Sequence, residues 1–221
     1  MGLISILQTD PQAGMILIIA LIFSLSFHEF AHAYVAYKLG DNTAAYQGRL
    51  TLNPLSHLDP VGSLMLLFIG FGYAKPVPVN PMNLSNPRTD MMKVAFAGPF
   101  SNLILCLFGC FLMRVIGVAD LTEIVGYKRM LNSTGNILFT FSIINMILAV
   151  FNMIPIHPLD GGQIFGGYLD RINPEFSFKL RSEGPKVLFA VIIIGYLTGF
   201  SIIGIIISPF HELVTIFAGL R

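Results

Sequence analysis

The 221-residue sequence has few charged residues and no tryptophan. Charged residues make up 11% of the chain, well below the roughly 25% of typical soluble domains, and 54% of the residues are hydrophobic. This shortage of charge excludes an ordinary soluble domain and predicts a polytopic membrane protein. The net charge of +1 also provides no basic surface, so a nucleic-acid partner is not expected.

Cysteine is equally scarce. The two cysteines, Cys106 and Cys110, lie four residues apart in one apolar run. They provide neither a disulfide framework nor a zinc site, so we interpret them as packing residues. The start of the chain lacks the basic segment and small-residue cleavage site of a signal peptide, and the first apolar run is therefore expected to be retained.

Long apolar runs define the expected architecture. A further run over residues 61–73 is too short for a comfortable crossing and contains three glycines, which predicts a re-entrant or interfacial segment. Alternation near 50–52 and alternate prolines in 75–80 predict short β-strands at a sheet edge. Pairing with an extended substrate and simple closure of the cytoplasmic mouth are equal alternatives for these segments. We expect one all-α, membrane-embedded domain over residues 1–221 with about four transmembrane helices, near 14–39, 91–118, 133–156 and 186–208.

The first apolar run contains the sequence Phe-His-Glu-Phe-Ala-His at residues 27–32. His28 and His32 are four residues apart and therefore share one face of a helix. With Glu29 between them, they match the pattern in which two histidines hold zinc and the glutamate is the general base. Histidines that only pack a helix are the alternative, but ionisable groups inside a membrane span are costly and usually mark function.

A catalytic zinc normally has three protein ligands, so one more is needed. If residues 61–73 enter and leave on one side, the third span returns Asp160 to the end of the first span that holds the histidines. Pro155 and Pro158 break the helix before Asp160, which favours Asp160, although a helix cap and ligation by His157 remain alternatives. The other candidates that we considered are His57, Asp59, His211 and Glu212.

Basic residues predict the orientation of the chain. In the re-entrant topology, nine of the 13 Lys and Arg residues share the side of the histidines and four lie opposite. The positive-inside rule then places the active site toward the cytoplasm and the N-terminus outside. The nine residues are Lys38, Arg49, Lys75, Arg88, Lys93, Arg171, Lys179, Arg181 and Lys186, and the four are Arg114, Lys128, Arg129 and Arg221.

Three segments together resemble the signatures of the site-2 protease family of intramembrane zinc metalloproteases. They are the sequence at 27–32, Ala97-Gly98-Pro99 with Asn102, and Asn152 followed by Pro155 and Leu159-Asp160-Gly161. The resemblance covers nearly the whole chain and is strongest to the compact branch that lacks a PDZ or other regulatory domain, since the predicted loop 120–132 leaves no room for one.

The resemblance implies one Zn²⁺ per chain, held by His28, His32 and Asp160, with Glu29 as the catalytic base. It implies that Asn102 and Asn152 lie near the substrate, and that the substrates are single-span membrane proteins in the lipid bilayer. We therefore expect an intramembrane zinc metalloprotease that hydrolyses peptide bonds in or near transmembrane segments. A divalent-metal transporter or channel is the alternative, but transport does not need Glu29 and the sequence has no internal repeat.

Overall fold

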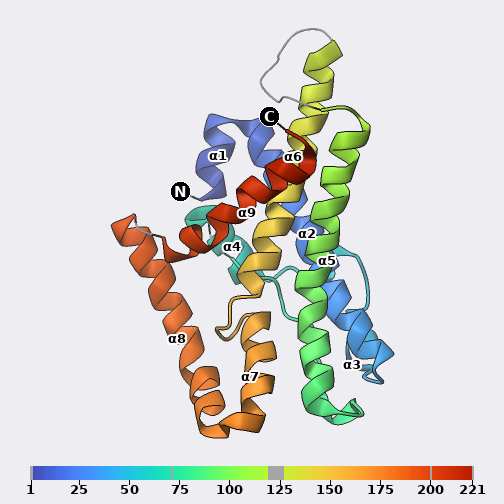
Figure 1. The fold of residues 1–221 in the computed structure, drawn as a ribbon, viewed down its shortest axis with the longest axis vertical. Coiled ribbons are helices and arrows are strands. Elements are labelled where there is room, and N and C mark those ends of the chain that lie inside the picture. Colours follow the sequence, from blue (N-terminus) through green and yellow to red (C-terminus); the bar gives the residue numbers. More distant parts are fainter. Residues whose placement is uncertain (1, 71, 119–126, 200, 221) are drawn as a thin grey trace.

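Three long helices form the centre of the molecule (Figure 1). The computed structural model describes residues 2–70, 72–118, 127–199 and 201–220. The three central helices are α2 (Pro11–Lys38), α5 (Pro87–Val115) and α6 (Tyr127–Asn152). Within the described residues, three helical stretches are long and apolar enough to cross a membrane, namely Pro11–Lys38, Pro87–Val115 and Ser133–Asn152. The protein is thus a multi-pass integral membrane protein.

Local chemistry sets the ends of these helices. The Asp10 carboxylate accepts a hydrogen bond from Ala13 N at the start of α2, and Gly40 adopts a positive φ of 106° just beyond its end. The third span ends at Asn152, four residues earlier than predicted. The reason is Pro155, since the residue before a proline disfavours helical geometry. Of the predicted loop 120–132, residues 127–132 belong to α6 and the rest lie outside the described residues.

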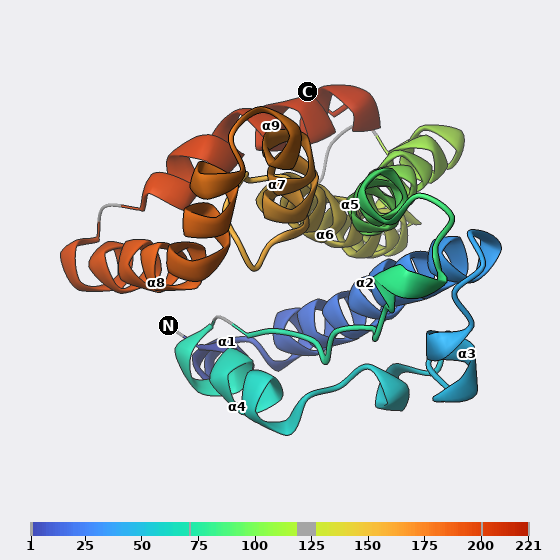
Figure 2. The same cartoon turned by 90° about the horizontal axis from the view of Figure 1, so that it is seen from below.

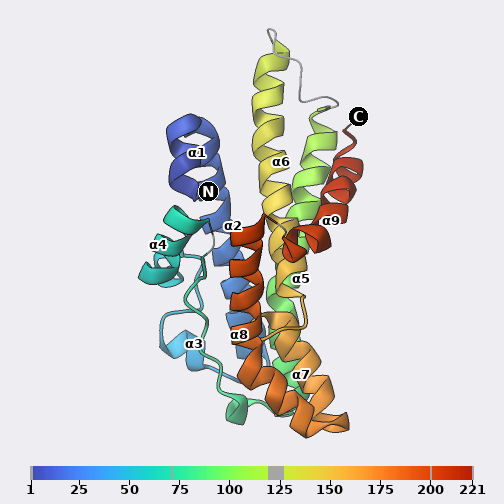
Figure 3. The ribbon, with the colours of Figure 1, turned by 90° about the vertical axis from the view of Figure 1, so that its left-hand side faces the viewer.

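The prediction of a continuous fourth span over 186–208 is wrong. Helix α8 (Pro174–Thr198) ends at Gly199, whose φ of 72° is left-handed and favours glycine. Helix α9 (Ile202–Ala218) then begins with the Ser201 side chain accepting a hydrogen bond from Gly204 N. Helix α9 crosses α5 and α6 at a steep angle to α8 (Figures 1 and 3).

The short apolar segment near 61–73 returns to the end where it enters, as its length predicts. Its helix α4 (Pro60–Ile69) begins with Asp59 accepting a hydrogen bond from Gly62 N. The chain then turns back, because Lys75 N donates to His57 O at 2.8 Å. A Cβ atom at Gly62 would collide with the Tyr73 carbonyl oxygen, so the two arms meet closely. Helix α1 (Leu3–Thr9) packs against α4 and α2.

The predicted β-strands are absent from the described residues, where a single bridge pairs Leu58 with Ala74. Pro76 and Pro78 have no N–H group and cannot extend this bridge into a ladder. At the other predicted strand, His57 Nε2 lies 2.8 Å from Thr51 O and occupies that backbone acceptor. The surrounding chain forms short helical pieces instead: α3 (Thr43–Tyr46), η1 (Pro54–Ser56) and η2 (Pro81–Asn83).

Helix α7 (Asp160–Ile172) completes the end of the bundle that holds the paired histidines. It packs against α5 and α8, and the view from below shows it between these two helices (Figure 2). The opposite end of α5 packs with α6 and α9 around an apolar core. That core comprises Cys106, Cys110, Met113, Val118, Met146, Val214 and Ala218.

Candidate metal centre

Three side chains predicted as ligands meet between α2 and the first residue of α7. His28 Nε2 lies 3.1 Å from one carboxylate oxygen of Asp160, and His32 Nε2 lies 3.3 Å from the other. The two histidine Nε2 atoms are 3.0 Å apart. All three possible ligand atoms lie within 4.8 Å of one another, and the group is buried or nearly so. Residues separated by more than a hundred positions thus converge on one point.

The hydrogen bonds behind the two imidazole rings determine which nitrogen faces this point. His28 Nδ1 lies 2.6 Å from Asn102 Oδ1, and His32 Nδ1 lies 2.7 Å from the Val94 carbonyl oxygen. Since both partners are acceptors, each Nδ1 carries the hydrogen and each Nε2 presents a lone pair. Two lone pairs and a carboxylate therefore face one another without a proton between them, an arrangement that a cation stabilises.

The size of the gap fits zinc. Nitrogen and oxygen ligands at about 2.0–2.1 Å around a tetrahedral zinc ion are about 3.3 Å from each other. The observed separations of 3.0–3.3 Å match that edge. Gly98 of α5 keeps the space open, because a Cβ atom there would lie 2.5 Å from His28 Nε2 and closer still to His32 Nε2.

Asp160 reaches the histidines because the chain turns sharply after α6. Its carboxylate lies in the first turn of α7, where the helix dipole favours negative charge. Gly161 and Gly162 allow this approach, since a Cβ on either would collide with the backbone of residues 153–157.

Asn102 is held by a polar chain across three helices. Its Nδ2 donates to Asn145 Oδ1 at 2.8 Å, which directs Oδ1 toward His28. Asn145 Nδ2 in turn donates to Ser24 Oγ at 2.8 Å. All three side chains are fully buried, so Asn102 lies behind His28. Asn145 was missed by the sequence reasoning, although an asparagine in the middle of an apolar helix was the available signal.

Glu29 faces a cavity of about 750 Å³ that also exposes His28, His32 and Asp160. Its Oε2 atom accepts a hydrogen bond from Val77 N at 3.1 Å. Asn152 lines the same cavity, whereas Asn102 does not. The base candidate, the ligand candidates and one of the two predicted substrate-binding residues therefore share one space.

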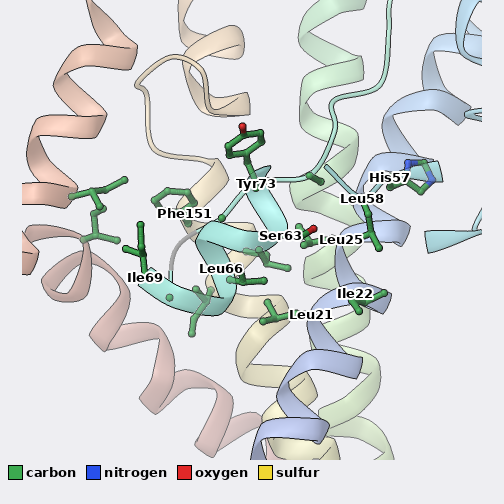
Figure 4. Close-up of a pocket in the computed structure, with 18 of the residues that line it drawn as sticks. Leu21, Ile22, Leu25, His57, Leu58, Ser63, Leu66, Ile69, Tyr73 and Phe151 are labelled. Atoms are coloured by element: carbon green, nitrogen blue, oxygen red, sulfur yellow. The ribbon is translucent and has the colours of Figure 1, made fainter. Parts of the chain in front are cut away.

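A second, apolar cavity of about 480 Å³ adjoins the first. Leu66 and Ile69 of α4 lie opposite Leu21 of α2 in this space (Figure 4). Tyr73 and Phe151 line both cavities and lie between them. An apolar segment that entered between α4 and the bundle would thus come close to the metal centre.

The other ligand candidates lie outside the three-residue group. His157 lines the larger cavity, and its buried Nε2 has no partner among the described residues. Burial and then the charge of Arg181 lower the pKa of His157, although Asp170 opposes them, so the ring is neutral near pH 7. His57 Nε2 is hydrogen-bonded to Thr51 O, and the Asp59 carboxylate caps the N-terminus of α4. His211 packs against the Phe139 ring in the bundle, and Glu212 follows it in α9.

Comparison of the sequence with known proteins finds one family match and several named relatives. The profile of Peptidase family M50 matches residues 16–198. YwhC of Bacillus subtilis is 42% identical over 82% of this chain and 80% of its own length. Rip2 of Mycolicibacterium smegmatis is 29% identical over 70% of this chain, and MJ0392 of Methanocaldococcus jannaschii is 28% identical over 88% of it.

The names of all three relatives describe zinc metalloproteases. The matched region spans about half the length of the latter two, at 56% and 47%. No solved structure gives a significant match.

Proposed function

Because the chain belongs to peptidase family M50, the site-2 protease family of zinc metalloproteases, we propose that it cleaves other membrane proteins in or near their transmembrane segments. The family assignment supports the protease over the metal transporter. The reaction is hydrolysis of a peptide bond, which yields a new carboxylate and a new amine.

The position of the candidate metal centre within α2 carries this proposal. His28 lies ten residues before the end of the helix at Lys38, which is about 15 Å along the axis. The stretch Pro11–Lys38 is one of the membrane-spanning candidates, and a centre at this depth in a spanning helix would lie within the thickness of the bilayer. A peptide bond can reach it only from a segment that lies in the membrane or at its surface.

We assign one zinc ion per chain to His28, His32 and Asp160. When bound, zinc would polarise the scissile carbonyl and lower the pKa of a water molecule to about 7. The neutral tautomers set by Asn102 and Val94 are those required for ligation through Nε2. Three protein ligands also leave the open position that a catalytic site requires.

Glu29 is the proposed general base. It would accept a proton from the attacking water and return it to the leaving amine nitrogen. Its place beside the ligands in the same cavity supports this role. Asn152, whose Nδ2 donates to Leu148 O, also lines the cavity and retains its amide oxygen for an extended substrate.

Single-span membrane proteins are the proposed substrates, because one apolar segment can enter the cavities without partners from its own chain. A helical substrate must unwind first, since a helix hides its carbonyl groups from attack. We place the centre toward the cytoplasm on the same nine-to-four distribution of Lys and Arg, which puts the end with α3 and α7 inside (Figure 3).

The test combines metal content with cleavage of a reporter that has one membrane span, in detergent. Wild type should contain zinc and cleave the reporter. Glu29→Gln should keep zinc and lose cleavage by about 10²–10⁴-fold, the usual contribution of a general base. Asp160→Ala should lose both. Undiminished cleavage by Glu29→Gln would contradict the mechanism, and full zinc in Asp160→Ala would move the third ligand to His157.

A further inference from the structure

The carboxylate of Glu29 is held by a backbone amide that lies 48 residues further along the chain. That amide, Val77 N–H, belongs to the extended segment Lys75–Asn80, here called the strap. We propose that Asp41 and Arg49 are positioning residues that fix the strap so that Val77 N–H orients Glu29. This inference rests on the proposed role of Glu29 and assigns functions to two residues outside the metal centre.

Arg49 anchors the first half of the strap. Its Nη2 donates to Lys75 O at 2.5 Å and to Pro76 O at 3.4 Å. The side chain is buried, with 6% of the residue exposed. Burying a guanidinium is costly unless its hydrogen bonds are made, and Arg49 Nε has no partner among the described residues, so the two Nη2 contacts are the ones that tie Arg49 to the strap. Only backbone atoms of the strap take part.

Asp41 anchors the second half. Its Oδ2 accepts a hydrogen bond from Asn80 N at 2.7 Å, while Oδ1 accepts from Thr43 and from Asn83. Burial raises the pKa of Asp41, but these hydrogen bonds outweigh it and hold the pKa below its usual range. Asp41 is therefore a fully buried, ionised anchor at neutral pH.

The prolines of the strap leave few backbone N–H groups that could bind Glu29. Pro76 and Pro78 have no N–H, so Val77 and Val79 supply the only amides between the two anchored ends. Val77 N donates to Glu29, whereas Val79 N has no hydrogen-bond partner among the described residues. The same prolines keep the backbone extended, so the positions of the two anchored ends fix the position of Val77.

This contact suits a base that must stay oriented. Glu29 is 9% exposed, and the strap amide occupies Oε2. No hydrogen bond from the described residues reaches Oε1, which leaves that oxygen for a proton from the cavity. A displacement of the carboxylate by about 1 Å can lower the reaction rate by about 10²-fold. An amide that fixes the carboxylate therefore preserves the rate.

The rival role for the strap is pairing with an extended substrate, and the two roles predict different kinetics. Loss of substrate pairing raises KM, because the pairing contributes to binding. Loss of orientation of Glu29 lowers kcat and leaves KM unchanged, because the base acts in the chemical step.

Val77→Pro removes the N–H that reaches Glu29 and suits an already extended, proline-rich backbone. Val79→Pro is its matched control, since it also follows a proline and removes an N–H without a partner. We expect Val77→Pro to lower kcat by about 10²-fold with KM within twofold and zinc content unchanged, and Val79→Pro to behave like wild type. An unchanged kcat, or a higher KM alone, for Val77→Pro would overturn the proposal.

Hydrogen exchange tests the contact without substrate or turnover. A peptide over residues 76–81 carries only three exchangeable amides, those of Val77, Val79 and Asn80, because its other residues are prolines. In the wild type, the hydrogen-bonded amides of Val77 and Asn80 should be protected from exchange. Glu29→Ala should release one, and Asp41→Ala should release both, since Val77 depends on the anchor.

Protection unchanged in Glu29→Ala, or release of a single amide in Asp41→Ala, would overturn the proposal. In the kinetic assay, Arg49→Gln should lower kcat in the same direction as Val77→Pro. If wild type cleaves no substrate, the proposed function fails while the exchange experiment still decides the contact. If wild type cleaves and Val77→Pro cleaves equally well, only the positioning role fails.

Discussion

The two ends of α5 differ in how they pack: one is held by buried hydrogen bonds and the other by an apolar core. At the end near the metal centre, α5 presents Gly98 and Asn102 to the histidines, and the buried polar side chains there are linked in a chain of hydrogen bonds. At the far end, Cys106, Cys110 and Met113 pack into an apolar core with α6 and α9. One end fixes the positions of atoms, and the other fills volume.

This contrast predicts how each end tolerates change. A polar chain that orients a ring depends on every hydrogen bond in it, because a buried polar group without a partner is costly. An apolar core depends on volume and accepts substitutions of similar size. The far end even tolerates Ser142 Oγ, a buried hydroxyl with no partner among the described residues.

The largest expected difference is between two glycines of α5. Gly98→Ala places a methyl group against both ligand nitrogens and should reduce zinc affinity and cleavage by more than about 100-fold. Gly109→Ala is the control, because its new Cβ would meet the rotatable Ser142 hydroxyl and should leave zinc content unchanged. Zinc analysis and reporter cleavage of both variants measure this. Equal losses in the two variants would remove the distinction between the ends.

A smaller effect is expected from two neighbouring residues of α6, of which one belongs to the polar chain and the other to the apolar core. Asn145→Leu removes the group that orients Asn102, and should weaken zinc binding by about 10–100-fold through His28. Met146→Leu changes a residue of the far core at nearly constant volume and should leave zinc affinity unaltered. Competition with a zinc chelator compares the two. Wild-type affinity in Asn145→Leu would show that the polar chain does not act on the metal centre.

The smallest effect should come from Arg114, at the far end alone. Its guanidinium donates to the carbonyl oxygens of Phe217 and Ile216 at the C-terminus of α9. Arg114→Gln should lower the free energy of unfolding by about 1 kcal/mol and leave cleavage intact. Thermal unfolding in detergent and the reporter assay measure the two quantities. A loss of cleavage larger than the loss of folded protein would mean that the two ends are coupled.

The sequence predicted which three side chains meet at the candidate metal centre better than it predicted the fold around them. The spacing of His28 and His32 fixes both on one helix face, and the short length of 61–73 fixes the side to which Asp160 returns. These are constraints of helix geometry and of bilayer thickness, which hold whatever the neighbours are.

The misses came from interactions that depend on neighbours. The run 186–208 is apolar throughout, and Gly199 with Ser201 breaks it where α9 packs across the bundle. The strap has the alternation of a strand, but its amides go to Glu29 and Asp41 instead of a ladder. Asn145 stands alone in its helix, and its partners come from α2 and α5.

The distance along the chain between the proposed ligands has a consequence for biogenesis. His28 and Asp160 are 132 residues apart. A nascent chain that has not yet reached Asp160 has two of the three proposed ligands and lacks the third corner of the site. High-affinity capture of zinc therefore belongs to a late stage of synthesis, after α6 has been inserted and the chain has turned back. Until α7 follows α6, the three proposed ligands cannot meet, so the order of synthesis sets the earliest stage at which the site can form.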